Sequence, residues 1–149
     1  MIILSTLIDA VQITLALGLA AFGLAIIYGL VGVINLGHGA MLTLGAYLYW
    51  TATTAGAPFI VGIVVAALGV AAIGLAFEHA IVRRFYSKPF DTMMITWGFF
   101  LVTSELIKIV YGTALLGVAN PFPGTIHIGE VALPIYKTLL SLISLCLLG

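Results

Sequence analysis

Residues 10–39 read AVQITLALGLAAFGLAIIYGLVGVINLGHG, and this stretch decides the class of the fold. From residue 10 to residue 34 the run is apolar apart from Gln12, Thr14 and Tyr28, and it contains no charged residue. A membrane-spanning helix needs about 20 mostly apolar residues to cross a hydrocarbon core about 30 Å thick. The run is therefore long enough to span a bilayer, and a polar, glycine-containing break follows it at residues 35–39.

The composition of the whole chain supports a membrane protein. Of its 149 residues 63% are hydrophobic and 7% are charged, whereas soluble domains carry roughly 25% charged residues. The formal net charge is zero, so charge indicates neither nucleic acid nor an acidic membrane surface as a partner. Residues 1–10 contain Asp9 and no Lys or Arg, unlike the basic start of a cleavable signal peptide. We therefore interpret the first apolar run as a true span.

Four further apolar runs follow the break, at residues 40–54, 58–82, about 91–112 and 134–149. Asp91 or Thr92 is expected to cap the fourth span. The last run would form a helix only about 24 Å long and ends without a flanking charge. The predicted fold is all-α, a polytopic transmembrane helix bundle of about five spans. The last span is expected to be truncated, with residues 1–149 forming the N-terminal part of one longer transmembrane domain.

Basic residues predict how the chain is oriented. Arg83, Arg84 and Lys88 lie in the short link between the third and fourth spans, and such clusters favour the cytoplasmic side. The N-terminus and residues 113–133, which carry no Lys or Arg, are then expected outside. Within that outer segment, weak alternation at residues 125–129 leaves a short hairpin open as an alternative to irregular chain.

The break between the first two spans has two interpretations. Irregular chain at membrane depth must face protein or a watery cavity, because unpaired backbone groups are costly in lipid. Under this hypothesis the candidate translocation residues are Asn35, Gly37, His38 and Gly39. The alternative is a tight turn at the cytoplasmic surface, with Asn35 and His38 capping helix ends. Spacing alone favours the surface turn.

Two groups of charged residues are further candidates. Glu105 and Lys108 are three residues apart and share a helix face, which predicts an intramembrane ion pair with a structural rather than a transport role. Glu78 lies with Arg83, Arg84 and Lys88 near the inner end of the third span. Interfacial anchoring accounts for this second group, and contact with a cytoplasmic partner subunit is the functional alternative.

No arrangement of residues typical of an enzyme is visible in the sequence. We find no nucleophile beside a base, no metal-spaced His, Cys, Asp or Glu cluster and no GxxxxGK phosphate loop. The sequence therefore predicts no catalytic residue, no metal and no cofactor. If ATP drives this protein, another chain must bind it.

Residues 23–39, GLAIIYGLVGVINLGHG, followed by LGAY at residues 44–47, resemble the permeases of branched-chain amino acid and urea ABC importers. Within that family residues 88–98, KPFDTMMITWG, and the pair Asn120–Pro121 are more similar to the urea- or amide-type permeases. The chain departs from the usual pattern at Gly37, where alanine is common, and at Ala40, where an acidic residue is common.

The resemblance implies a permease subunit of an ATP-driven importer in the cell inner membrane. Its solute would be a branched-chain amino acid, urea or a short amide, moved by alternating access. The implied partners are a second permease subunit, cytoplasmic ATPase subunits and an external solute-binding protein, with membrane lipid around them. Asn35 and His38 would line the pathway, residues 120–130 would meet the binding protein, and residues 83–88 would face the ATPases. Composition permits equally an ATP-independent channel or facilitator.

Overall fold

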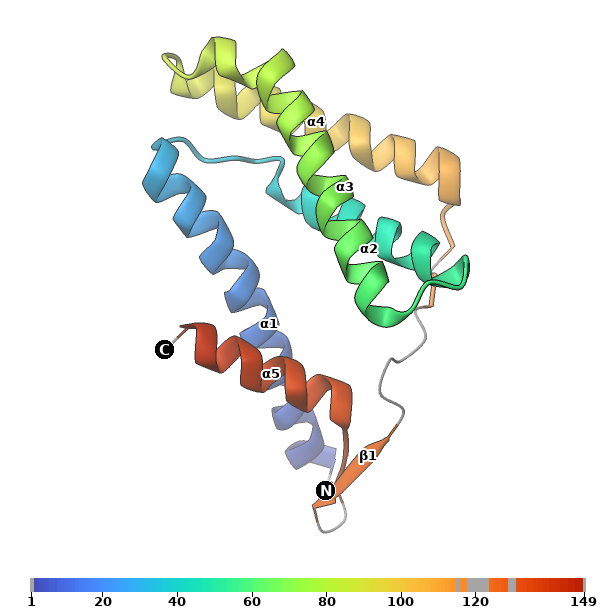
Figure 1. Cartoon of the computed structure of the whole chain (residues 1–149). Coiled ribbons are helices and arrows are strands. Elements are labelled where there is room, and N and C mark those ends of the chain that lie inside the picture. Colours follow the sequence, from blue (N-terminus) through green and yellow to red (C-terminus); the bar gives the residue numbers. More distant parts are fainter. Residues whose placement is uncertain (1, 115, 118–123, 129–130, 149) are drawn as a thin grey trace. The chain divides into compact units, whose positions relative to one another are not determined.

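The computed structural model describes residues 2–114, 116–117, 124–128 and 131–148. The chain divides into two compact units, one formed by residues 1–26 with 119–149 and the other by residues 27–118. Five α-helices account for most of the described residues (Figure 1). The prediction of a helical membrane bundle is therefore confirmed, and the two units are described separately below.

Three helices form the larger unit, together with the end of α1 (Ile2–Val31). They are α2 (His38–Thr54), α3 (Phe59–Ala80) and α4 (Pro89–Tyr111), and a short 3₁₀ helix, η1 (Val82–Phe85), precedes α4. These bounds lie within a few residues of the expected spans. Helix α2 packs against both α3 and α4. The turn between α2 and α3 uses Gly56 at φ +94°, a backbone conformation that favours glycine.

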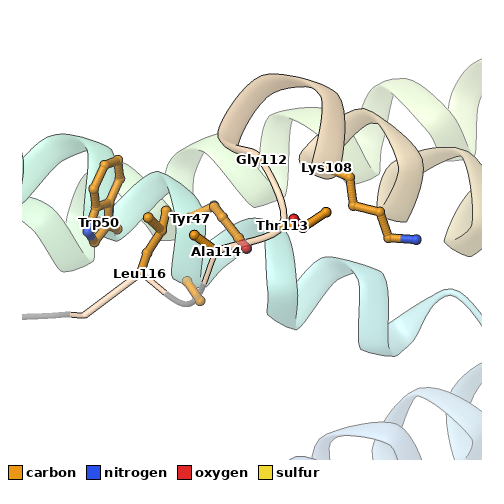
Figure 2. A pocket seen from close by; sticks show the side chains of 8 residues that line it. Tyr47, Trp50, Lys108, Gly112, Thr113, Ala114 and Leu116 are labelled. Carbon is orange, nitrogen blue, oxygen red and sulfur yellow. The ribbon is translucent and has the colours of Figure 1, made fainter.

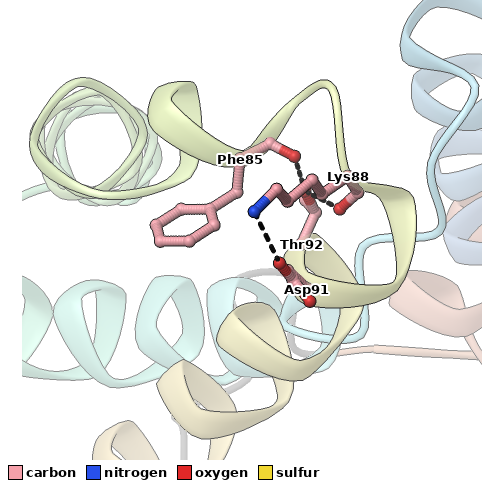
Figure 3. A network of polar contacts seen from close by, with 4 residues as sticks. All are labelled: Phe85, Lys88, Asp91 and Thr92. Atoms are coloured by element: carbon pink, nitrogen blue, oxygen red, sulfur yellow. Dashed lines mark hydrogen bonds and ion pairs between the residues drawn. The ribbon is translucent and has the colours of Figure 1, made fainter.

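Prolines start two of these helices, as expected from their fixed φ and missing N–H group. Pro58 is the N-cap of α3, and Pro89 occupies the first turn of α4. The prediction that Asp91 or Thr92 caps α4 is wrong, because the N-cap is Lys88 and makes no side-chain cap hydrogen bond. Thr92 is buried inside the first turn instead, and its hydroxyl donates to the carbonyl oxygens of Phe85 (2.7 Å) and Lys88 (3.1 Å) (Figure 3).

The smaller unit contains the first part of α1, a hairpin and helix α5 (Ile135–Leu148). Strand β1 (Thr125–Ile128) pairs antiparallel with β2 (Val131–Pro134), with Ile128 opposite Val131. The short hairpin, which the sequence analysis gave as an alternative to irregular chain, is therefore present. Helices α1 and α5 are joined by an ion pair between Lys137 Nζ and Asp9 Oδ1 at 2.9 Å.

Three helices are long and apolar enough to cross a membrane within the part of the chain that is described. They are the Thr6–Leu30 part of α1, α3 and α4. Helices α2 and α5 are shorter, at 17 and 14 residues. Many large apolar side chains on the helices are exposed, as expected for surfaces that face lipid or another subunit rather than water.

Glycines on α3 allow α2 to approach closely. A Cβ atom added at Gly62 would lie 2.9 Å from Tyr49 Cε2 and 3.0 Å from Thr53 Cγ2, and one at Gly69 would lie 2.7 Å from Leu48 Cδ1. Small residues at such contacts let helix backbones pack in lipid, where no hydrophobic force drives apolar helices together.

We expect Gly62→Ala to weaken the contact between α2 and α3, because the new methyl group overlaps the Tyr49 ring. Overpacking of this kind costs about 1–3 kcal/mol. The matched control is Gly98→Ala on α4, where a Cβ atom meets nothing within 4 Å. Thermal unfolding of the detergent-solubilised protein measures both. A Gly62→Ala protein as stable as the Gly98→Ala protein would contradict the packing.

Candidate functional site

The polar break begins where α1 ends. Gly32 adopts φ +72°, which favours glycine and turns the chain out of the helix. Its N–H donates to the Tyr28 carbonyl at 2.7 Å. The chain is then non-helical until α2 starts at His38.

Asn35 closes a turn within the break. Its Oδ1 atom accepts the Gly37 N–H at 2.9 Å, and its carbonyl oxygen accepts the His38 N–H at 3.2 Å. This arrangement is an Asx turn. The hypothesis that Asn35 and His38 cap helix ends does not hold for α2, because its N-cap is Gly37, without a side-chain cap hydrogen bond, and His38 is already helical.

Helix α4 holds the break through Thr96. Leu36 lies outside the helices, so its N–H has no acceptor within a helix. This N–H donates to Thr96 Oγ1 at 3.1 Å. Thr96 is only 2% exposed, and its own hydroxyl donates to the Met93 carbonyl at 3.0 Å. Gly37 also approaches this helix, since a Cβ atom there would lie 3.0 Å from the Thr96 carbonyl oxygen and 3.2 Å from Phe99 Cδ1. The break is therefore packed closely against α4, and a Cβ atom at Gly37 would require its neighbours to shift by a few tenths of an ångström.

A cavity of about 230 Å³ lies beside the break. Its walls include the apolar side chains of Val33, Met41, Phe77 and Val82. The polar residues that line it come from four segments of the chain, namely Asn35, Glu78, Tyr86, Thr92 and Thr96. Two sequence candidates, Asn35 and Glu78, thus meet at one cavity. Gly37, His38 and Gly39 are not among its lining residues, although Gly39 lies close to Phe100 of α4.

Glu78 and Tyr86 form the charged side of this cavity. The Tyr86 hydroxyl donates to Glu78 Oε1 at 2.9 Å. Burial of the phenol, together with the hydrogen bond to the Glu78 carboxylate, raises the pKa of Tyr86 above its usual range. Tyr86 therefore stays protonated at neutral pH and remains a hydrogen-bond donor to Glu78.

Among the described residues, no ion pair joins Glu78 to the basic candidates. Arg83 and Arg84 are exposed on η1, and Arg83 Nη1 is 3.5 Å from His79 Nδ1. Lys88 Nζ lies 3.9 Å from Asp91 Oδ2 (Figure 3). The structure thus divides the predicted cytoplasmic group into an exposed basic link and one cavity-lining carboxylate.

A second cavity, of about 330 Å³, lies between the C-terminal halves of α2 and α4 (Figure 2). Tyr47, Trp50, Lys108 and Leu116 are among its lining residues. Trp50 Nε1 donates to the Gly117 carbonyl at 3.2 Å. Lys108 Nζ pairs with Glu105 Oε1 at 2.7 Å, and both side chains are more than half exposed (54% and 66%).

Sequence reasoning missed the threonines of α4. Thr92, Thr96 and Thr103 are all buried, and their separations of four and seven residues place them on one helix face. Polar residues within an apolar span tend to face the bundle interior, so this spacing was an available signal. No cluster of three potential metal ligands occurs in the part of the chain that the structure describes.

Comparison with known proteins gives one family. Residues 6–148 match the family described as "Branched-chain amino acid transport system / permease component". No curated protein matches the chain, and no solved structure does.

We expect Thr96→Val to destabilise the break, because the Leu36 N–H would lose its acceptor. Leaving such a group unsatisfied costs about 1–3 kcal/mol. Thr96→Ser keeps the hydroxyl and should recover most of the loss. Thr103→Val is the control, since it removes a buried hydroxyl from the same helix without touching the break. Equal melting temperatures for Thr96→Val and Thr103→Val would show that the bond to Leu36 contributes nothing.

Proposed function

The chain belongs to the permease family of branched-chain amino acid transport systems, and we propose that it is a subunit of an ATP-driven importer for a small polar solute. A membrane transport protein follows from the family and the apolar helices. The proposal adds the energy source, the direction of transport and the class of solute, namely a branched-chain amino acid, urea or a short amide.

The packed polar break is the observation that carries this proposal. A polar solute that leaves water needs hydrogen-bond partners inside the membrane, and transporters supply them where helices are interrupted. Residues 32–37 interrupt the helices here, and the cavity beside them is lined by five polar residues. We assign Asn35, Gly37, His38 and Gly39 to the translocation pathway, with Asn35 in contact with the solute and Gly37 permitting the close approach of α4.

We propose the remaining partners from the family to which the chain belongs. The chain contains no GxxxxGK loop, so cytoplasmic ATPase subunits would hydrolyse ATP. A second permease subunit would complete the pathway against the exposed apolar helix faces, and an external binding protein would deliver the solute. The basic link at residues 83–88 would face the cytoplasm, and the N-terminus would then lie on the outer side of the inner membrane.

Orientation can be tested by labelling single cysteines with a membrane-impermeant thiol reagent, after Cys146→Ser removes the exposed native thiol. Ser87→Cys in the basic link should react only from the cytoplasmic side. Thr113→Cys, just beyond the other end of α4, should react only from outside. Both positions are exposed. The reverse pattern would overturn the orientation.

Transport can be tested by ATP-driven uptake into proteoliposomes that contain the full-length chain and its partner subunits. We expect Asn35→Leu to lower uptake per assembled complex by roughly tenfold, because one solute hydrogen bond is lost. Asn35→Asp keeps the oxygen that accepts the Gly37 N–H, and so it controls for the turn. Near-normal uptake per complex in Asn35→Leu would remove Asn35 from the pathway. Uptake that continues without ATP hydrolysis would replace the importer with a channel or facilitator.

A further inference from the structure

Glu78 stands out among the acidic residues of the larger unit because it lines a cavity. Asp91 is paired with Lys88, and Glu105 with Lys108. Glu78 instead contacts Tyr86 through Oε1. Its Oε2 atom is not among the buried side-chain atoms that lack a partner within the described residues, so it is accessible to a ligand that donates a hydrogen bond.

The other polar groups of the cavity offer mainly acceptors. The Thr92 hydroxyl donates to the carbonyl oxygens of Phe85 and Lys88. The Thr96 hydroxyl donates to the Met93 carbonyl oxygen. The Tyr86 proton is used by Glu78. Thr96 Oγ1 and Asn35 Oδ1 each already accept one backbone N–H, from Leu36 and Gly37. Each of these oxygens keeps one further lone pair, Glu78 adds its carboxylate, and the Asn35 amide contributes the donor groups of its own NH₂.

The acceptors share the cavity with apolar side chains. Val33, Met41, Phe77 and Val82 also line it, and a hydrogen bond to the charged Glu78 carboxylate is stronger than one to a neutral acceptor. A ligand that matches these acceptors carries several N–H bonds and is small enough for a cavity of about 230 Å³. An ammonium group and a primary amide or urea nitrogen meet this description, whereas a fully N-methylated group does not.

We propose that Glu78 is a solute-binding residue, which with Asn35 and Thr96 forms an acceptor-lined site for the N–H-donating group of the transported solute. This inference rests on the proposed transport function and adds a residue and a ligand chemistry to it. Tyr86 occupies Oε1 and leaves Oε2 for the ligand.

Binding can be measured without transport, by protection of a cysteine inside the cavity. Met41→Cys places a thiol among the lining residues, in a full-length chain that also carries Cys146→Ser and is assembled with its partner subunits. The label is a small membrane-permeant maleimide, applied without ATP. The probes are acetamide and ammonium chloride, and their matched controls are N,N-dimethylacetamide and tetramethylammonium chloride.

Acetamide or ammonium should slow the labelling of position 41, and the methylated controls should not. Glu78→Gln should weaken the protection by about tenfold, because a charged acceptor is replaced by a neutral one. Glu105→Gln, which changes a glutamate outside this cavity, should leave protection unchanged. Tyr86→Phe should preserve or increase protection, since it frees Oε1 of Glu78 for the ligand.

Four results would overturn the assignment. They are equal protection by methylated and unmethylated probes, unchanged protection in Glu78→Gln, loss of protection in Tyr86→Phe, and a thiol at position 41 that does not react at all because other groups fill the cavity. The uptake assay separates this inference from the function on which it rests. Protection by the predicted probes without ATP-driven uptake would refute the importer and keep the site, whereas uptake without protection would refute the site alone.

Discussion

The hydrogen bond from the Leu36 N–H to Thr96 Oγ1 is the interaction on which the arrangement of the larger unit depends. A chain that leaves the helical conformation among apolar helices exposes backbone groups that lipid cannot satisfy. Here a buried threonine on α4 accepts one such N–H, and Asn35 accepts another from Gly37. Once the break is held in this way, Asn35 lies at the cavity that Glu78 also lines.

The interior of the larger unit is built from small and hydroxyl-bearing residues. Thr92, Thr96 and Thr103 are buried beside Ala40 and a few larger apolar residues, while many large apolar side chains lie exposed. This distribution is the reverse of that in a soluble domain. The reason is the lipid solvent. Burying an apolar side chain away from lipid gains little free energy, so close packing of helix backbones contributes more to helix association.

Helix α4 contributes to each of the two cavities described above. Thr92 and Thr96 line the smaller cavity near its N-terminal end, and Lys108 lines the larger one near its C-terminal end. The two cavities differ in chemistry, since hydrogen-bond acceptors dominate the first, whereas aromatic rings and a lysine line the second. A movement of α4 relative to α2 and α3 would alter both, which makes this helix the natural element to follow when transport is studied.

The sequence by itself determined the features that depend on neighbouring residues. Hydropathy places α2, α3, α4 and α5 within a few residues, because helix formation and its termination are local. Helix α1 begins at Ile2, well before the expected start near residue 10. The pair Glu105–Lys108 follows from a separation of three residues on one helix. The glycine- and asparagine-containing motif at residues 23–39 identified the family, which the match over residues 6–148 confirms.

Tertiary structure alone decided which distant residues meet. Leu36 and Thr96 are 60 residues apart, and their contact depends on how α4 is rotated about its axis, which hydropathy does not encode. For the same reason Glu78 could not be separated in advance from the basic cluster that follows it, and Thr92 was mistaken for a cap. The threonine spacing on α4 indicates a buried face, but only the packed helices show that this face holds the break.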